Sequence, residues 1–232
     1  WQAFPHIAAA PNGTFMAVWT TGWMAHGQRF SSSCEKLGDQ FNIGFSFNGL
    51  DVASDSNGDF WVVRSHQGKG YLDKYSNAGE QLVDGLIYYE AEAPIRNVIT
   101  VLQDGRAVVG WYNGNNPGGS DAYGLMINAN GTIAGAPFLI NQTRANNQRS
   151  PLFTALPNGG FVAVWESFGQ GGALYDIYGR IFDAAGTGSG EIWISEGAEG
   201  NHQTPFVTPR ADGGFAVGWT NKTAPQHVLM RA

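Results

Sequence analysis

Hydrophobic and polar positions along the chain follow one fifteen-residue pattern that occurs five times without an internal gap. The copies cover residues 5–19, 50–64, 97–111, 151–165 and 205–219. In each copy the third residue is a large hydrophobe and the fourth is small, which is the alternation of a half-buried β-strand. The eighth and ninth residues are Asn-Gly or Asp-Gly, as in Asn158-Gly159, a pair typical of tight hairpin turns. Each copy therefore predicts a strand, a turn and a second strand.

Further strands are predicted after each copy. The second strand of each copy is almost continuously apolar, as in 161–165, which favours a strand covered on both faces. After a loop of variable length, a third strand is expected at 27–30, 71–75, 124–127, 179–182 and 227–230. Short polar turns that end in glycine follow, and then fourth strands such as 137–140 and 191–194. Each repeat therefore predicts a four-stranded antiparallel meander.

The repeats predict an all-β fold: one domain over 1–232, a five-bladed β-propeller of four-stranded antiparallel blades. The last repeat lacks a fourth strand, whereas residues 1–4 precede the first copy. We therefore expect the N-terminal strand to complete the last blade and close the ring. An open fragment of a larger propeller and a two-sheet sandwich are the alternatives, and both leave strand edges unpaired.

Composition narrows the possible partners. Charged residues make up 14% of the chain and the formal net charge is −6, which argues against a nucleic-acid partner. No run of eighteen apolar residues occurs, so membrane insertion is not expected. The single cysteine, Cys34, leaves no internal disulfide to form. Because the chain opens on Trp1 without an initiator Met or signal peptide, we expect a mature form or an excised domain.

One face of the predicted blades is the better candidate for a site. Its loops are long, unequal and polar, at 20–25, 65–70, 112–123, 166–178 and 220–226, and unequal loops on a rigid scaffold are where sites usually lie. They are rich in amides with interspersed aromatics, which suits a glycan or small-molecule ligand. The candidates for ligand binding on this face are Trp23, Tyr89, Tyr112, Asn113, Tyr175 and Tyr178. The alternative for each aromatic is that it only covers its blade.

Arg64 and His66 are added to these candidates. Arg64 occupies the position that tryptophan fills in the other four copies, at 19, 111, 165 and 219. We interpret the four tryptophans as core. A guanidinium at this position predicts either an anion or carboxylate contact or a structural pair with an acid such as Asp51 or Glu90.

Catalytic signals are weak. His6 and Asp51 occupy the same position in adjacent repeats and are the first pair to test as acid and base, although both could be ordinary strand-start residues. A glycosidase would need two facing carboxylates. The acids expected on the loop face are Asp51, Glu90, Glu92, Asp121, Glu166, Asp176, Glu196 and Glu199. No metal-ligand spacing and no cofactor motif is present, and 55–59 lacks the final glutamate of a calcium loop.

Three segments carry a family resemblance. The segment Asp/Asn-Gly-Gly-Phe-x-x-x-Trp, followed by 176–186 and then Gln203-Thr-Pro205, resembles propeller-type repeats of large secreted or surface bacterial proteins, including repeat-toxin-like adhesins. The predicted architecture is also similar to that of tachylectin-type lectins. The resemblance implies a secreted or cell-surface protein.

These observations lead to a carbohydrate-binding, lectin-like module without enzyme activity as the main hypothesis. The first alternative is an enzyme with one central pocket on the long-loop face, either a glycan hydrolase or lyase or a small-molecule cyclase that uses Tyr88 and Tyr89. The second alternative is a protein-interaction scaffold. Several equivalent shallow sites would favour the lectin, and one deep asymmetric pocket would favour the enzyme.

Overall fold

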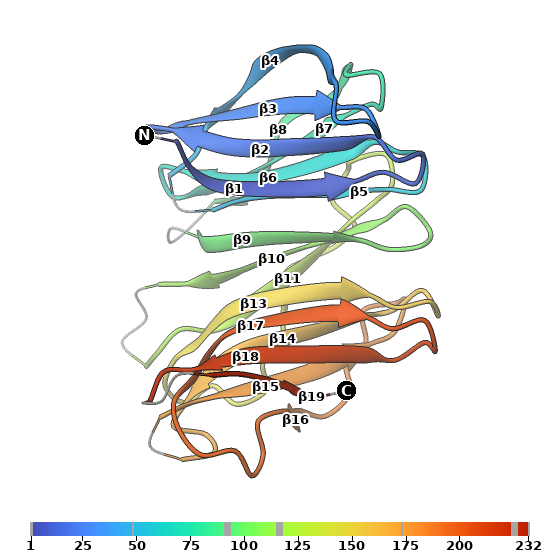
Figure 1. Ribbon diagram of the computed structural model, residues 1–232. Coiled ribbons are helices and arrows are strands. Elements are labelled where there is room, and N and C mark those ends of the chain that lie inside the picture. Colours follow the sequence, from blue (N-terminus) through green and yellow to red (C-terminus); the bar gives the residue numbers. More distant parts are fainter. Residues whose placement is uncertain are drawn as a thin grey trace. The chain divides into compact units, whose positions relative to one another are not determined.

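The regular elements of the chain are strands. The structure is a computed structural model that describes residues 2–47, 49–90, 94–114, 118–172, 174–223 and 227–231. No helix occurs in this part of the chain, and so none is long and apolar enough to span a membrane (Figure 1). The strands form four sheets of four strands and one sheet of three. The predicted all-β class is confirmed, and the antiparallel four-stranded sheets are consistent with a propeller.

The chain divides into two compact units. The first comprises Trp1–Val109 and Leu125–Gly135, and the second comprises Gly110–Gly124 and Ala136–Ala232. The division falls within the third sheet, so the sheets and the units do not coincide. That the whole chain forms one domain stays a prediction.

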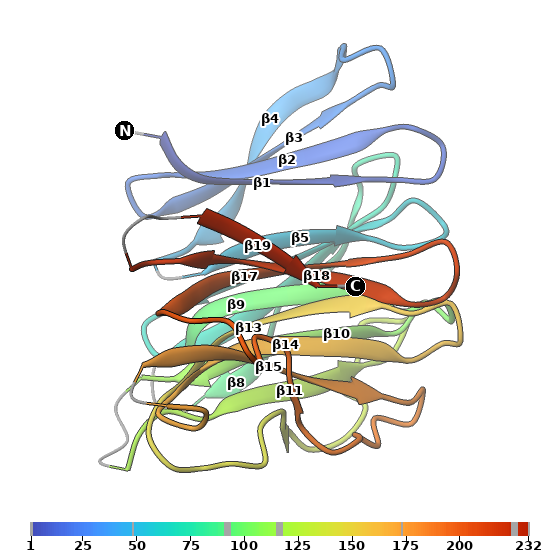
Figure 2. The same cartoon turned by 60° about the horizontal axis from the view of Figure 1, so that its bottom comes forward.

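The first two sheets belong to the first unit and have the strand orders β1-β2-β3-β4 and β5-β6-β7-β8 (Figures 1 and 2). Their strands are β1 (Gln2–Ala9), β2 (Phe15–Thr21), β3 (Met24–Phe30), β4 (Lys36–Phe45), β5 (Leu50–Ser54), β6 (Phe60–His66), β7 (Lys69–Tyr75) and β8 (Gln81–Glu90). Sequential strands are neighbours throughout, which confirms the predicted meanders.

The third sheet has the order β12-β11-β10-β9, the fourth β13-β14-β15-β16 and the fifth β17-β18-β19. Their strands are β9 (Pro94–Val101), β10 (Ala107–Asn113), β11 (Ala122–Ile127), β12 (Phe138–Leu139), β13 (Gln148–Ala155), β14 (Phe161–Phe168), β15 (Tyr175–Phe182), β16 (Ile192–Trp193), β17 (His202–Pro209), β18 (Phe215–Asn221) and β19 (His227–Arg231). The fourth strands β12 and β16 are only two residues long.

The turns between the first and second strands have the expected geometry. Their glycines all have φ between 83° and 89°: Gly13, Gly58, Gly105, Gly159 and Gly213. Glycine adopts this left-handed region without a Cβ clash. In the fourth sheet, Leu156 N–H donates to Gly160 O at 2.8 Å and closes the turn. The Asn/Asp-Gly pairs therefore fix these hairpins locally.

The second strands form the core of their sheets. Every residue of β6 except His66 is buried. Trp111 and Trp165 are fully buried and Trp219 is 4% exposed, which confirms these three as packing residues, whereas Trp19 is only half-buried. In the second unit, the cluster around Val164, Ile177 and Trp219 joins the fourth and fifth sheets. Each buried aliphatic side chain of this kind stabilises the fold by about 1.5–3 kcal/mol.

The prediction that the N-terminal strand completes the last blade is wrong for the described residues. Gln2 and Ala3 pair with Thr21 and Thr20, so they extend the first strand of the first sheet. The reason is that β2 continues past Trp19 and offers partners to these residues. Trp1 lies outside the described residues, and in the part described the fifth sheet has three strands.

Candidate active site

Asp51 and His6 lie side by side in the first unit. His6 is on β1 and Asp51 is on β5, and His6 Nδ1 is 3.1 Å from Asp51 Oδ1. The His6 side chain is 43% exposed and the Asp51 side chain is 19% exposed. His6 and Asp51 are thus in contact with each other and accessible to solvent. Their role as acid and base stays a prediction.

Backbone donors hold the Asp51 carboxylate in place. Val52 N–H donates to Asp51 Oδ1 at 2.9 Å, and Ile99 N–H donates to Asp51 Oδ2 at 3.0 Å. Ile99 is on β9, so Asp51 contacts the first strands of three successive repeats. A carboxylate that is fixed in orientation and still partly open to solvent is suited to exchange a proton with a bound water or substrate.

A β-bulge lies next to this pair. In the β1–β2 ladder the register shifts between Ala3 and His6, and Phe4 has φ of 52°. Arg96, Ser150 and Thr204 hold the equivalent position in later repeats, with φ of 57°, 56° and 49°. Proline follows three of these four residues, at positions 5, 151 and 205, and proline lacks the N–H that a regular ladder needs; Asn97 follows Arg96. A β-bulge changes the direction in which the neighbouring side chains point, and in the first sheet His6 is one of these neighbours.

Arg64 is held in a buried ion pair. Its Nε lies 2.8 Å from Asp73 Oδ2, its guanidinium lies 4.5 Å from the centre of the Tyr71 ring, and it donates to Phe45 O at 3.2 Å. Burial raises the pKa of the Asp73 carboxyl, and the Arg64 guanidinium and the Gly85 N–H offset part of that rise. The guanidinium therefore has little surface left for a ligand.

The structural pair expected for Arg64 is present, but with a different acid. Asp51 contacts His6, and Glu90 pairs with Lys69. Asp73 lies on the neighbouring strand β7, where a regular ladder places it on the same face as Tyr71, the register partner of Arg64. Asp51 or Glu90 as the partner is therefore wrong.

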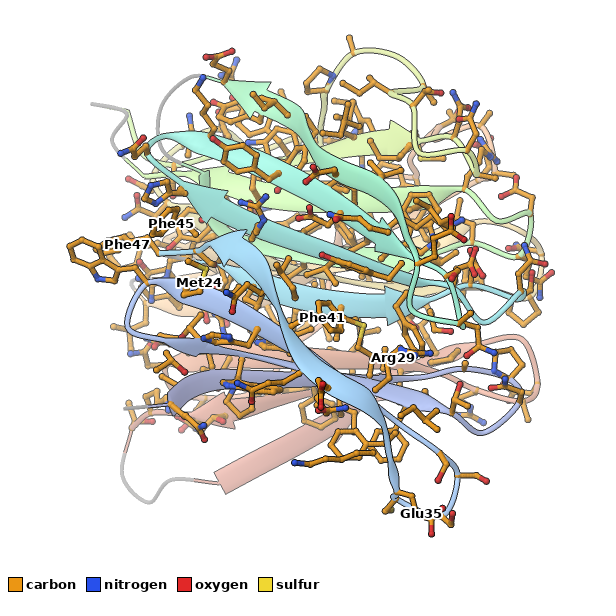
Figure 3. All side chains as sticks on the ribbon, turned by 90° about the horizontal axis from the view of Figure 1, so that it is seen from above. Met24, Arg29, Glu35, Phe41, Phe45 and Phe47 are labelled. Atoms are coloured by element: carbon orange, nitrogen blue, oxygen red, sulfur yellow. The ribbon has the colours of Figure 1, made fainter. Side chains whose placement is uncertain are left out.

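Exposed aromatic side chains gather at the end of β4. Trp23 is 64% exposed, Phe45 51% and Phe47 56%. The Trp23 and Phe47 rings meet edge to face with centroids 5.9 Å apart, and Phe45 stacks on half-buried His66 at 5.0 Å. Figure 3 shows Phe45 and Phe47 at one end of this strand and Glu35 near the other. We call Trp23, Phe45, Phe47 and His66 the aromatic ledge.

Backbone hydrogen bonds fix the ledge. Ser46 N–H donates to Trp23 O at 2.8 Å, and Phe47 N–H donates to Ser65 O at 2.7 Å. Ser46 Oγ donates to Gly49 O at 3.1 Å. The segment after β4 is thus tied to the loops that carry Trp23 and His66. The sequence singled out Trp23 and His66 as candidate binding residues, whereas Phe45 and Phe47 were not among the candidates.

Tyr175 and Glu166 belong to a closed ion-pair network in the second unit. The Arg149 guanidinium lies 3.9 Å from the centre of the Tyr175 ring, and Arg149 Nε is 2.7 Å from Glu166 Oε2. Thr204 N–H donates to the other oxygen of Glu166 at 2.8 Å. Both oxygens of Glu166 are therefore engaged, and its side chain is 3% exposed.

Tyr178 and Asn113 contribute to packing and loop closure. The Tyr178 ring stacks between Trp165 and Trp193, at 6.5 and 6.1 Å, and burial raises its pKa to about 12. Asn113 is buried, and its Oδ1 accepts the Asp121 N–H at 2.7 Å. Neither side chain presents a broad exposed face to a ligand.

The tyrosines on β8 differ in exposure. Tyr88 is 5% exposed, and burial raises its pKa well above the ordinary value. Its ring lies so close to Gly70 that a Cβ there would be 2.5 Å from it. Tyr89, and Tyr112 in the second unit, are half-buried. A phenol enclosed like that of Tyr88 offers no surface to a substrate, and the cyclase alternative itself stays a prediction.

Ser195, His202 and Asp176 lie together in the second unit, but they are not arranged as a catalytic triad. The Ser195 hydroxyl donates a hydrogen bond to Asp176 Oδ1 at 2.9 Å, and the same Oδ1 lies 3.0 Å from His202 Nδ1. His202 is fully buried and Ser195 is 1% exposed. In a catalytic triad the serine bonds to the histidine, whereas here it bonds to the aspartate. We therefore interpret this group as structural.

The remaining acids are engaged or exposed. Asp121 pairs with Arg144 at 2.9 Å and accepts from Asn141 at 2.7 Å. Glu196 and Glu199 are exposed, and Glu92 lies outside the described residues. Across the part of the chain that the structure describes, no three His, Cys, Asp or Glu residues are grouped to hold a metal ion.

Solved structures share the fold of this chain. An endo-arabinase from Bacteroides thetaiotaomicron is 13% identical, with a TM-score of 0.57 over 97% of this chain and 92% of that chain. A thermostable family-43 glycoside hydrolase is also 13% identical, with a TM-score of 0.57 over 97% and 87%. An apocarotenoid oxygenase from Synechocystis is 10% identical, with a TM-score of 0.59 over 98% and 58%. No protein-family profile and no curated protein matches the chain.

These comparisons correct the main functional hypothesis. The similar structures include glycoside hydrolases, which are enzymes, so the expected lectin module without enzyme activity gives way to the enzyme alternative. The resemblance to repeat-toxin-like adhesins and tachylectin-type lectins receives no support from a family profile. At these identities the likeness shows the propeller-like fold alone, because one fold hosts many chemistries.

Proposed function

We propose that this protein is a glycoside hydrolase in which Asp51 transfers the proton and His6 positions Asp51. The observation that carries the proposal is the 3.1 Å contact between His6 Nδ1 and Asp51 Oδ1. The two residues occupy equivalent positions in adjacent repeats, and the Asp51 carboxylate is partly exposed to solvent. The fold likeness to an endo-arabinase and a family-43 glycoside hydrolase supports the reaction class. It also makes arabinose-containing glycans the first substrates to assay.

Hydrolysis of a glycosidic bond needs a base for the attacking water and an acid for the leaving oxygen. Asp51 accepts a proton from the water while the water oxygen forms a bond to the anomeric carbon. The bond from that carbon to the leaving oxygen breaks, the electron pair goes to that oxygen, and the oxygen takes its proton from solvent water, which reaches the partly exposed Asp51. His6 is a positioning residue here because it acts through Asp51.

The five sheets form the five blades of one propeller in this proposal. Support comes from the shared strand order of the four-stranded sheets and from the bulge that recurs at Phe4, Ser150 and Thr204. A secreted or cell-surface location, where polysaccharides are met, belongs to the same proposal.

Release of new reducing ends from linear arabinan, arabinoxylan and xylan by the full chain tests the reaction class. Asp51→Asn keeps the shape of the side chain but removes its basicity, and we expect it to lower kcat about 10³-fold. Asp104→Asn is the matched control, since Asp104 lies in an exposed turn and pairs with Arg106. Equal activity of Asp51→Asn and the parent chain would contradict the assignment, and no reducing ends from any glycan would contradict the reaction class.

A further inference from the structure

We infer that the aromatic ledge is a substrate subsite that holds the polysaccharide chain beside the cleaved bond, an inference that rests on the proposed hydrolase function. Three of its four side chains expose more than half of their surface. A contiguous group of large exposed aromatics is unusual on a soluble protein and marks an interaction site.

The chemistry of the ledge fits a sugar chain. A sugar ring has an apolar C–H face that packs on an aromatic ring, and hydroxyl groups at its rim that need polar partners. Trp23 and Phe47 present two rings at 75° to each other, so they offer faces in two directions. His66 stacks on Phe45 and brings ring nitrogens that can bond to hydroxyls. Apolar platforms with a few polar groups are the usual form of small-ligand sites.

The ledge is close to the proposed catalytic carboxylate along the chain. Phe47 is four residues before Asp51, so their Cα atoms are at most about 14 Å apart even if the chain is fully extended. Both belong to the first unit. In the first sheet β1 begins at the end where β2 and β4 finish, and His6 of β1 contacts Asp51. A polysaccharide bound on the ledge is thus within reach of Asp51.

The ledge is also preorganised. The backbone bonds from Ser46 to Trp23 and from Phe47 to Ser65 join the three segments that carry it. Binding then orders few protein groups, which lowers the entropic cost of holding a chain of sugars. The occupant we assign is the substrate polysaccharide, because the ledge joins exposed rings to a histidine and lies four residues from Asp51 along the chain. A second copy of the protein is the competing occupant.

Comparison of polymeric and small substrates tests the inference. We measure kcat/KM on linear arabinan and on a chromogenic aryl arabinofuranoside for Trp23→Ala, Phe47→Ala and the control Phe206→Ala. Phe206 is 42% exposed on β17 in the second unit. Loss of one stacked aromatic should lower kcat/KM on arabinan about tenfold more than on the aryl glycoside. Phe206→Ala should leave both values unchanged.

Native gels cast with arabinan measure binding of the polymer separately from its cleavage, because a variant that binds arabinan migrates more slowly. They therefore test this inference independently of the proposed function. If Asp51→Asn is retained but does not cleave, while Trp23→Ala is not retained, the ledge binds the polymer. If Asp51→Asn cleaves normally, the proposed active site fails, yet loss of retention in Trp23→Ala still supports the ledge. Equal retention of Trp23→Ala and the parent chain overturns the subsite. Sedimentation that shows a dimer dissolved by Trp23→Ala assigns the ledge to a second copy and also overturns it.

Discussion

Arg64 Nε lies 2.8 Å from Asp73 Oδ2, and the two side chains are only 9% and 0% exposed. Arg64→Met should lower the free energy of unfolding by about 3–5 kcal/mol, because it leaves the Asp73 carboxyl buried without its cation. Denaturant unfolding measures the change. Arg210→Met is the control, since Arg210 pairs with Asp212 on the exposed surface, and its midpoint should not move. An unchanged midpoint for Arg64→Met would show that the pair does not stabilise the fold.

Glu191 should make stability depend on pH in the acid range. Burial by itself would raise the pKa of Glu191, but hydrogen bonds from Gln142, Thr143 and Gln170 outweigh it and lower the pKa below the ordinary 4.5. A lowered pKa means that the ionised form stabilises the fold above the pKa of the unfolded chain, and that this stability is lost as pH falls through the folded value.

Unfolding titrations between neutral pH and the acid range test this prediction. Glu191→Gln should lower the free energy of unfolding at neutral pH by about 1–2 kcal/mol and should flatten its acid dependence. Parallel pH curves for the variant and the parent chain would exclude Glu191 as a source of acid sensitivity.

Ser195→Ala should destabilise the protein without changing its activity. The serine hydroxyl donates to Asp176 and accepts the Ile177 N–H at 3.0 Å, so its removal leaves buried groups unpaired. We expect a loss of about 1–3 kcal/mol in the free energy of unfolding. Loss of glycan cleavage, or labelling of Ser195 by a serine-directed phosphonate, would indicate a nucleophile after all.

His6→Ala should lower kcat about tenfold with little change in KM, because His6 orients Asp51 and makes no separate contribution to substrate binding in the proposal. His6→Asn keeps a donor near the position of Nδ1 and should recover part of kcat. A rise in KM at constant kcat would instead assign His6 to substrate binding.

Much of the fold could be predicted from the sequence because its signals are local. The Asn/Asp-Gly turns fix hairpins by the φ that glycine adopts, and the apolar second strands identify the buried layer. The proximity of His6 and Asp51 followed from their equal repeat positions. The bulges also had a signal, since proline follows Phe4, Ser150 and Thr204.

Other features depended on strand register, which the pattern does not encode. Asp73 reaches Arg64 only because Tyr71 is the register partner of Arg64, and Tyr178 is covered because the two-residue strand β16 places Trp193 over it. The repeat ends at Trp19 and does not show that β2 extends to Thr21, so the pattern alone wrongly predicts that the N-terminal strand completes the last blade. The ledge was missed in part because Phe45 and Phe47 lie outside the repeated phrase.

The measurement that tests the central claim most directly is the rescue of Asp51→Ala by a small anion. The variant should release reducing ends from arabinan about 10³-fold more slowly than the parent chain, and added azide or formate should restore part of the rate by replacing the missing carboxylate. Circular dichroism and the unfolding midpoint establish that the variant is folded. Undiminished cleavage by folded Asp51→Ala would contradict the assignment of Asp51 as the proton-transferring group.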